Sequence, residues 1–228
     1  MDNKGSMIRM FNVSKRYGKK YAVKDISLEI TAGEFVFLTG PSGAGKSTIM
    51  KMIYLAERAS DGQIIVDGMN LDRISHARAP LLRRRIGVIF QDFKLIPNRT
   101  VFANVALVLE AAGQRPGAIK NRVMEVLKTM GIEDKANALP PSLSGGEQQR
   151  AAVARAVVGN PGIILADEPT ASLDNRSAQA VLDSLVQFHA MGTTILIASH
   201  NIQMVSTLSR ARSISLVDGS LAGMATML

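Results

Sequence analysis

The sequence reads Phe35-Val36-Phe37-Leu38-Thr39-Gly40-Pro41-Ser42-Gly43-Ala44-Gly45-Lys46-Ser47-Thr48 where an apolar strand gives way to a helix expected over residues 48–56. The glycines allow a tight turn that points successive backbone N–H groups at an anion, and the helix N-terminus adds the positive end of its dipole. Lys46 adds a full positive charge and Ser47 a hydroxyl suited to Mg²⁺. The stretch therefore predicts a phosphate-binding loop in an α/β protein.

Two carboxylates follow another apolar strand, in Ile163-Ile164-Leu165-Ala166-Asp167-Glu168. Ligands of open parallel sheets collect at the carboxyl ends of the strands. Asp167 offers a hard oxygen ligand for Mg²⁺, and Glu168 suits a base that activates an attacking water. Beside a phosphate-binding loop, this pair predicts a hydrolytic site.

A pair of glycines lies at a predicted helix start, in Leu143-Ser144-Gly145-Gly146-Glu147. Ser144 and Glu147 have the spacing of a capping box. Capping does not account for Gly145 and Gly146, each of which costs a helix about 1 kcal/mol relative to alanine. We infer that another group approaches this helix closely, and a second phosphate is the candidate.

Apolar runs that alternate with helical patterns predict an α/β fold. Strands are expected near residues 8–13, 22–30, 35–39, 64–66, 86–90, 163–167, 194–199 and 213–217. The later runs are apolar throughout, as in a parallel sheet covered on both faces, whereas turn residues separate the early ones and predict an antiparallel layer. Residues 100–131 space their apolar side chains as helices do, which indicates an inserted helical subdomain.

Composition excludes several classes of protein. With 46% hydrophobic and 20% charged residues among 228, the chain is neither disordered nor fibrous. It has no cysteine, which excludes disulfides and thiolate metal sites and fits a reducing compartment. No run approaches the roughly 18 apolar residues that cross a bilayer, so we expect any membrane association to come through a partner. The net charge of +8 gathers at residues 15–24 and 83–85, where a solvated face and a binding patch are both open.

Taken together, these stretches resemble the ATP-binding subunits of ABC transporters. The resemblance spans residues 7–217 and is carried by residues 40–47, 143–147, 163–168, 172–174 and His200. It implies a RecA-like P-loop core with an antiparallel β layer and an inserted α-helical subdomain. We expect one ABC ATPase domain over residues 7–228, with the core at 7–90 and 161–228 and the helical subdomain at about 98–160. Residues 1–6 are interpreted as a tag remnant or a disordered leader.

The resemblance also implies roles for single residues. Gln91 matches the loop glutamine that reaches Mg²⁺ and the attacking water, and His200 matches the histidine that contacts the γ-phosphate. Tyr17 stands where the family stacks an aromatic ring on adenine, with a surface tyrosine as the alternative. The implied ATP contacts are Tyr17, Gly40, Pro41, Ser42, Gly43, Ala44, Gly45, Lys46, Ser47, Thr48, Ser144, Gly145, Gly146 and Asp174, the Mg²⁺ ligands Ser47, Gln91 and Asp167, and the catalytic residues Lys46, Gln91, Glu168 and His200.

Partners follow from the same resemblance. ATP would lie between two copies in a head-to-tail dimer whose closure drives an integral membrane protein at the cytoplasmic face of the inner membrane. No nucleic-acid partner is expected. Phe93 and Leu95 place apolar side chains in an expected surface loop and are candidates for docking the membrane protein. The alternative is that they fold back onto the helix at residues 100–109.

Within the family, residues 82–95 and 99–105 are most similar to the bacterial cell-division branch, in which the stroke would regulate cell-wall hydrolysis. An ATPase subunit of a lipoprotein-release, macrolide-export or solute transporter is the first alternative. A soluble ABC ATPase of DNA repair or the ribosome is the second. The soluble types carry a long coiled-coil insertion, zinc-binding cysteines or a second cassette, and this sequence contains none of them.

Overall fold

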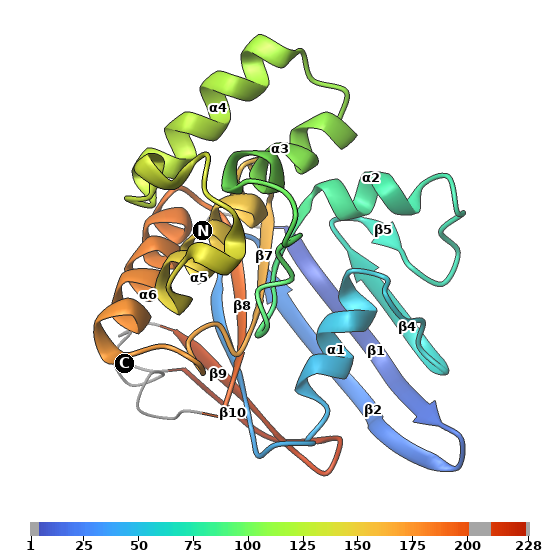
Figure 1. Ribbon diagram of the computed structural model, residues 1–228. Coiled ribbons are helices and arrows are strands. Elements are labelled where there is room, and N and C mark those ends of the chain that lie inside the picture. The colour runs from blue at the N-terminus through green and yellow to red at the C-terminus, as the bar shows by residue number, and fades with distance from the viewer. Residues whose placement is uncertain (1–4, 201–210, 227–228) are drawn as a thin grey trace. The chain divides into compact units, whose positions relative to one another are not determined.

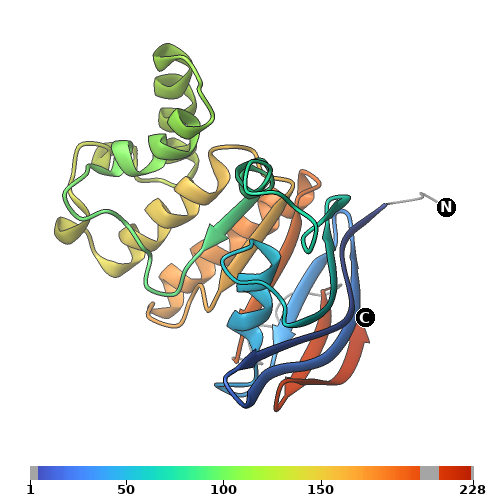
Figure 2. The ribbon, with the colours of Figure 1, turned by 90° about the vertical axis from the view of Figure 1, so that its right-hand side faces the viewer.

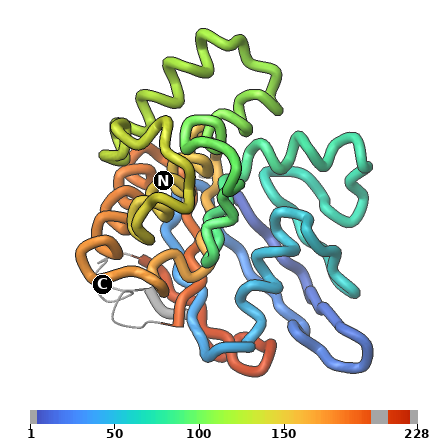
Figure 3. The backbone as a smooth tube through the Cα atoms, viewed as in Figure 1, coloured from blue at the N-terminus to red at the C-terminus, as the bar shows by residue number. Residues whose placement is uncertain are grey.

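The computed structural model describes residues 5–200 and 211–226, and its backbone is traced in Figure 3. The chain forms two compact units, residues 1–83 with 192–228 and residues 84–191, which we call unit 1 and unit 2. Residues 1–4, most of the expected leader, lie outside the described part. The expected division into core and helical subdomain stays a prediction.

Unit 1 contains an antiparallel sheet with strand order β2-β1-β4-β5. The strands are β1 (Ser6–Tyr17), β2 (Lys20–Thr31), β4 (Asp61–Val66) and β5 (Met69–Asn70), and Figure 1 shows the long β1–β2 hairpin in blue. Ile8 pairs with Ile30 and Met10 with Leu28, and all four side chains are buried. Buried side chains at every second position are what a sheet with one covered face requires. The predicted antiparallel layer is confirmed.

Unit 1 also contains β3 (Phe35–Thr39), which pairs in parallel with β8 (Thr194–Ser199) and with β9 (Arg212–Val217). The side chains of β8 and the first four of β3 are buried, as expected of strands covered on both faces. The strand β10 (Ser220–Thr226), which we did not predict, pairs antiparallel with β9 through the turn at Asp218 and Gly219. Both turn residues have positive φ, 48° and 77°, and Asp-Gly is the sequence that such a tight turn favours.

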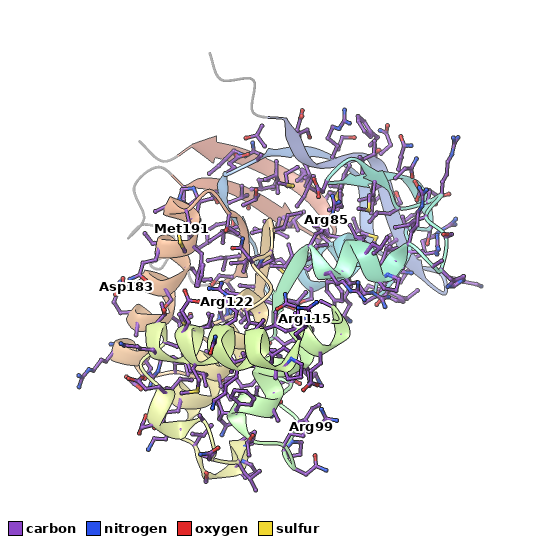
Figure 4. The ribbon with its side chains drawn as sticks, turned by 90° about the horizontal axis from the view of Figure 1, so that it is seen from above. Arg85, Arg99, Arg115, Arg122, Asp183 and Met191 are labelled. Carbon is purple, nitrogen blue, oxygen red and sulfur yellow. The ribbon has the colours of Figure 1, made fainter. Side chains whose placement is uncertain are left out.

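Unit 2 pairs two parallel strands, β6 (Ile86–Ile89) and β7 (Ile163–Asp167), which run side by side in Figure 2. Its helices are α3 (Val101–Ala111), α4 (Pro116–Thr129), α5 (Gly145–Val157) and α6 (Asn175–Ala190), with short 3-10 turns at Glu133–Lys135 and Pro140–Ser142. Helix α5 packs on the other three helices and on β6. A Cβ at Gly87 of β6 would lie 2.4 Å from the Ala156 carbonyl oxygen, so only glycine allows this approach. Arg122, labelled in Figure 4, donates from α4 to the Val158 carbonyl just after α5.

The basic run at residues 83–85 has structural partners. Arg83 belongs to the short helix α2 (Ala79–Arg84) and donates to the carbonyls of Tyr54 and Leu55, just beyond the C-terminus of α1 (Lys46–Ile53). In unit 2, Arg84 donates to the Ala111 carbonyl, the last residue of α3. Cations at helix C-termini satisfy carbonyls that have no partner within the helix. Two of the three arginines therefore donate hydrogen bonds to carbonyls at helix C-termini.

Candidate nucleotide-binding site

The phosphate loop joins β3 to α1 within unit 1. Gly40, Gly43 and Gly45 have φ of 141°, 80° and 102°, a region that other residues rarely adopt. A Cβ at Gly40 would lie 2.2 Å from the Leu216 carbonyl oxygen and one at Gly45 2.5 Å from that of Ala22, whereas one at Gly43 would meet nothing. Crowding and φ thus both require glycine at two positions, and φ alone favours it at the third.

Lys46 begins helix α1, with Gly45 as the N-cap, so the helix starts two residues before the predicted residue 48. The reason is that the turn is completed by Gly45, which leaves Lys46 free to take helical angles. Its side chain is only 6% exposed, and its ammonium donates to the carbonyls of Gly40 (2.7 Å) and Pro41 (3.1 Å). The Lys46 ammonium therefore binds the carbonyls at the start of the loop, and Ser47, the next residue, is exposed. This is the arrangement that an anionic phosphate chain needs.

Tyr17, the candidate adenine-stacking residue, is held by a charged network at the end of β1. Its hydroxyl donates to a Glu57 carboxylate oxygen and makes a hydrogen bond with Thr48 of the phosphate-loop stretch. The Lys15 ammonium lies 5.3 Å from the ring centroid and 3.3 Å from Glu57. Burial and the Glu57 hydrogen bond raise the pKa of Tyr17, and the hydrogen bond from Tyr17 with the charge of Lys15 lowers the pKa of Glu57. The ring is still 48% exposed, so it is available for stacking.

His200 follows β8 directly and is exposed. Ser199 of β8 is the register partner of Thr39, the residue before Gly40. Because parallel strands that pair in register end at the same edge, His200 and the phosphate loop leave the sheet together. Unit 1 thus brings together Tyr17, the phosphate loop and His200.

Unit 2 places the predicted carboxylates at the end of β7. Ile89 pairs with Ala166, so Gln91 after β6 and Asp167 at the end of β7 leave this strand pair at one edge. Gln91 is exposed, and Asp167 and Glu168 are half-buried. These side chains offer an amide and two carboxylates, the hard oxygen donors that Mg²⁺ prefers. The donor chemistry therefore fits the predicted metal ion.

Glu168 has an unusual backbone. Its φ is 47°, a left-handed conformation that costs a residue with a side chain roughly 1–2 kcal/mol. The next residue is Pro169, and the Glu168 carbonyl accepts a hydrogen bond from the Ala171 N–H at 3.2 Å. The catalytic candidate thus sits in a strained turn that its neighbours must hold.

The capping box at the start of α5 is present as predicted. The Ser144 hydroxyl accepts from the Glu147 N–H at 3.3 Å, and the Glu147 carboxylate accepts from the Ser144 N–H at 2.8 Å. Hydrogen bonds from the Ser144 main chain and hydroxyl lower the pKa of Glu147. A Cβ at Gly145 would meet nothing, so its surroundings leave room for a ligand.

Gly146 has a partner within its own chain. A Cβ there would lie 2.5 Å from the Ser177 hydroxyl, which donates to Asp174 at 2.7 Å. Asp174 is the N-cap of α6 and accepts from the Ser177 N–H, and this main-chain bond is the first cause of its lowered pKa. Our inference of a close approach at the glycine pair therefore has an intramolecular explanation at Gly146. The start of α5 and the loop that ends at Asp174 are packed together.

The loop from Gln91 to Thr100 is held by two side chains that sequence reasoning missed. Arg155 of α5 donates to the carbonyls of Phe93 (2.7 Å) and Lys94 (2.5 Å), two residues with positive φ. Burial lowers the pKa of Arg155. Phe93 and Leu95 are half-buried, so they neither join the core fully nor stand free.

Asn104 of α3 is the second of these side chains. It is 0% exposed, accepts from the Ile96 N–H at 2.7 Å and donates to the carbonyls of Ile96, Arg99 and Thr100. An asparagine on the apolar face of a predicted helix was the available signal, because a buried amide must find hydrogen-bond partners.

Comparisons with known proteins agree with this geometry. The sequence profile described as "ABC transporter" matches residues 23–171. The chain belongs to the ABC transporter family. The chain is 47% identical over 215 residues to the cell division ATP-binding protein FtsE of Bacillus subtilis strain 168, with 93% of each chain covered. The FtsE of Escherichia coli K12 is 45% identical over 218 residues, which cover 95% of this chain and 98% of that protein.

A solved structure extends the likeness to the fold. It is a dimeric post-hydrolysis state of the ATP-binding cassette MJ0796 bound to ADP and Pi, which matches with a TM-score of 0.90 at 34% identity over 97% of this chain and 99% of that one. The predicted family, its cell-division branch and the fold class are thereby confirmed. The helices in the described part of the chain are too short or too polar to span a bilayer.

Proposed function

We propose that this chain is an ATPase that hydrolyses Mg-ATP, dimerises on ATP and drives an integral membrane partner during bacterial cell division. The observation that carries the ATPase activity is the phosphate loop, with its positive-φ glycines and the Lys46 ammonium 2.7 Å from the Gly40 carbonyl. Sequence identities of 47% and 45% to two cell-division ATP-binding proteins over more than nine-tenths of the chain support the cellular role.

ATP binding is assigned to unit 1 groups. The main-chain N–H groups of Gly40 and of residues 42–48, together with the Lys46 ammonium, bind the β- and γ-phosphates, which carry negative charge that dipoles and a cation both stabilise. The exposed ring of Tyr17 stacks on adenine, and its fixed hydroxyl limits the entropy lost on binding. His200 contacts the γ-phosphate.

Hydrolysis is assigned to Glu168. Its carboxylate takes a proton from the attacking water while the water oxygen bonds to the γ-phosphorus, and the bond from that phosphorus to the bridging oxygen breaks to leave ADP and phosphate. Ser47, Gln91 and Asp167 would hold Mg²⁺, which neutralises phosphate charge when bound. The φ of 47° at Glu168 turns the main chain out of the extended path of β7, which ends at Asp167.

Dimerisation is assigned to the start of α5 and to Asp174. Ser144, Gly145 and Gly146 offer a capped helix N-terminus with open space at Gly145, which suits the γ-phosphate of ATP bound to the other protomer. Asp174 closes the loop that crosses to the opposite subunit. The post-hydrolysis dimer of MJ0796, bound to ADP and Pi, supports this arrangement.

The membrane partner would be an FtsX-like protein that docks near Phe93 and Leu95 at the cytoplasmic face of the inner membrane. Both side chains are half-buried on a loop whose backbone is held by Arg155 and Asn104. A rigid loop that presents apolar side chains binds a partner helix without a large ordering cost. Closure of the dimer on ATP would regulate cell-wall hydrolysis through this partner.

Two variants test the ATPase site. Lys46→Ala should abolish ATP binding in a nucleotide titration, because it removes the full charge that lies across the phosphate loop. Glu168→Gln should bind ATP normally and hydrolyse it about 10²–10⁴ times more slowly, since it removes the proton acceptor. Size measurement with Mg-ATP should then detect a trapped dimer. Parental ATP affinity in Lys46→Ala, or parental turnover in Glu168→Gln, would contradict the proposal.

A further inference from the structure

A buried amide reaches the turn that holds Glu168. Gln149 lies on α5, is 1% exposed, and donates through Nε2 to the Pro169 carbonyl at 2.6 Å. The sequence-based roles leave Gln149 unused. Both residues belong to unit 2, and this hydrogen bond joins α5 to the residue that follows the catalytic candidate.

The geometry gives Gln149 one possible orientation. Its Oε1 is buried and finds no donor in the described part of the chain. Exchanging the two amide atoms would set Oε1 against the Pro169 carbonyl oxygen, where two acceptors repel. A buried acceptor without a partner costs free energy, so packing alone would favour an apolar side chain of the same shape. The amide of Gln149 is therefore best explained by the hydrogen bond that its Nε2 donates to the Pro169 carbonyl.

What the donor does is fix the turn after β7. Glu168 holds φ at 47°, and Pro169 cannot donate a main-chain hydrogen bond to stabilise it. The turn is held by the Ala171 N–H on the Glu168 carbonyl and by Gln149 on the Pro169 carbonyl. Loss of the Gln149 bond would let the peptide between Pro169 and Thr170 rotate, which would shift the Ala171 N–H that holds the Glu168 carbonyl, and the Glu168 carboxylate would move with this turn.

We propose that Gln149 is a positioning residue for Glu168, so that α5 and the catalytic carboxylate move as one body. The inference rests on the proposed function, in which Glu168 activates water. It also deepens that function, because the first residues of α5 are those assigned to the ATP of the other protomer. The role of Gln149 is positioning, because its amide donates to the Pro169 carbonyl, in the residue that follows Glu168.

The test is the full chain carrying Gln149→Met, which keeps the length of the side chain and removes the donor. We expect kcat for ATP to fall about 10- to 100-fold, as a small displacement of a reacting group does, with KM for ATP within about twofold. The midpoint of thermal unfolding should stay near the parental value, because the variant takes the donor from one buried acceptor, the Pro169 carbonyl, and removes another that has none, the Gln149 Oε1. If Gln149→Met fails to fold, Gln149→Leu also removes the donor and puts a shorter apolar side chain in its place.

A double-mutant cycle separates positioning from general damage. In the Glu168→Gln background, Gln149→Met should cause no further loss of hydrolysis, because both act through the same carboxylate. The control is Gln148→Met on the same helix, whose amide donates to the Leu143 carbonyl instead, and its kcat should stay within about twofold.

Three results would overturn the inference: an unchanged kcat in Gln149→Met, an equal loss in Gln148→Met, or full additivity with Glu168→Gln. Parental activity in Glu168→Gln alone would instead overturn the proposed function.

Discussion

Replacing Asn104 by alanine should destabilise the protein measurably, although the side chain is small and lies on a helix. The amide makes four hydrogen bonds, to the N–H and carbonyl of Ile96 and to the carbonyls of Arg99 and Thr100. The Thr100 carbonyl keeps its bond from the Asn104 N–H at 2.9 Å, and the Ile96 carbonyl keeps its bond from the Arg99 N–H at 3.2 Å, so two main-chain groups lose their partner.

At about 1 kcal/mol net for each of these two groups, the loss is about 2 kcal/mol. Alanine returns about 0.5 kcal/mol through its higher helix propensity. The expected decrease in the free energy of unfolding is therefore about 1.5 kcal/mol. For a chain of this size it corresponds to a fall of about 3–6 °C in Tm.

The assay is urea unfolding followed by circular dichroism, with a thermal scan alongside. Asn98→Ala is the matched control, because Asn98 is exposed on the same loop and its loss should stay within about 0.5 kcal/mol. A loss below about 1 kcal/mol in Asn104→Ala, or an equal loss in Asn98→Ala, would refute the view that this amide holds the loop.

Two further predictions concern the assembly. Gly146→Asp should prevent the ATP-driven dimer while the monomer still binds ATP, because its carboxylate would face the γ-phosphate of the ATP bound to the other protomer. Gly146→Ala controls for crowding against Ser177, and a normal dimer of Gly146→Asp in gel filtration would refute the shared site. Phe93→Glu and Leu95→Glu should keep ATPase activity and lose recruitment to membranes that contain the partner, and co-purification of these folded variants with the membrane protein would exclude docking at this loop.

The site could be predicted from sequence where its chemistry is contiguous. The phosphate loop needs glycines, a lysine and a serine within a few residues, and their conformations are set by neighbours along the chain. The strands at residues 35–39, 163–167 and 194–199 have the predicted bounds, because they are apolar throughout and end at a turn or a charge. The capping box at Ser144 is equally local.

Other features could not be predicted, because the residues next to them in the sequence do not determine them. Two-residue strands such as β5 carry too few side chains for a pattern, and the strained φ of Glu168 has no sequence signature before a proline. The close contact between Gly146 and Ser177 was not predicted, because helices α5 and α6 meet only in the folded chain, and the role of Gly146 as an ATP contact stays a prediction.

The sequence by itself therefore determined the family, the α/β class and the residues whose chemistry handles phosphate. Only the tertiary structure decided which side chains hold those residues in place: Gln149 acts on Pro169 from 20 positions away, Glu57 on Tyr17 from 40, and Arg155 on Phe93 from 62. The physical reason is that a buried polar side chain must find a hydrogen-bond partner wherever packing brings one, and packing is set by the whole fold.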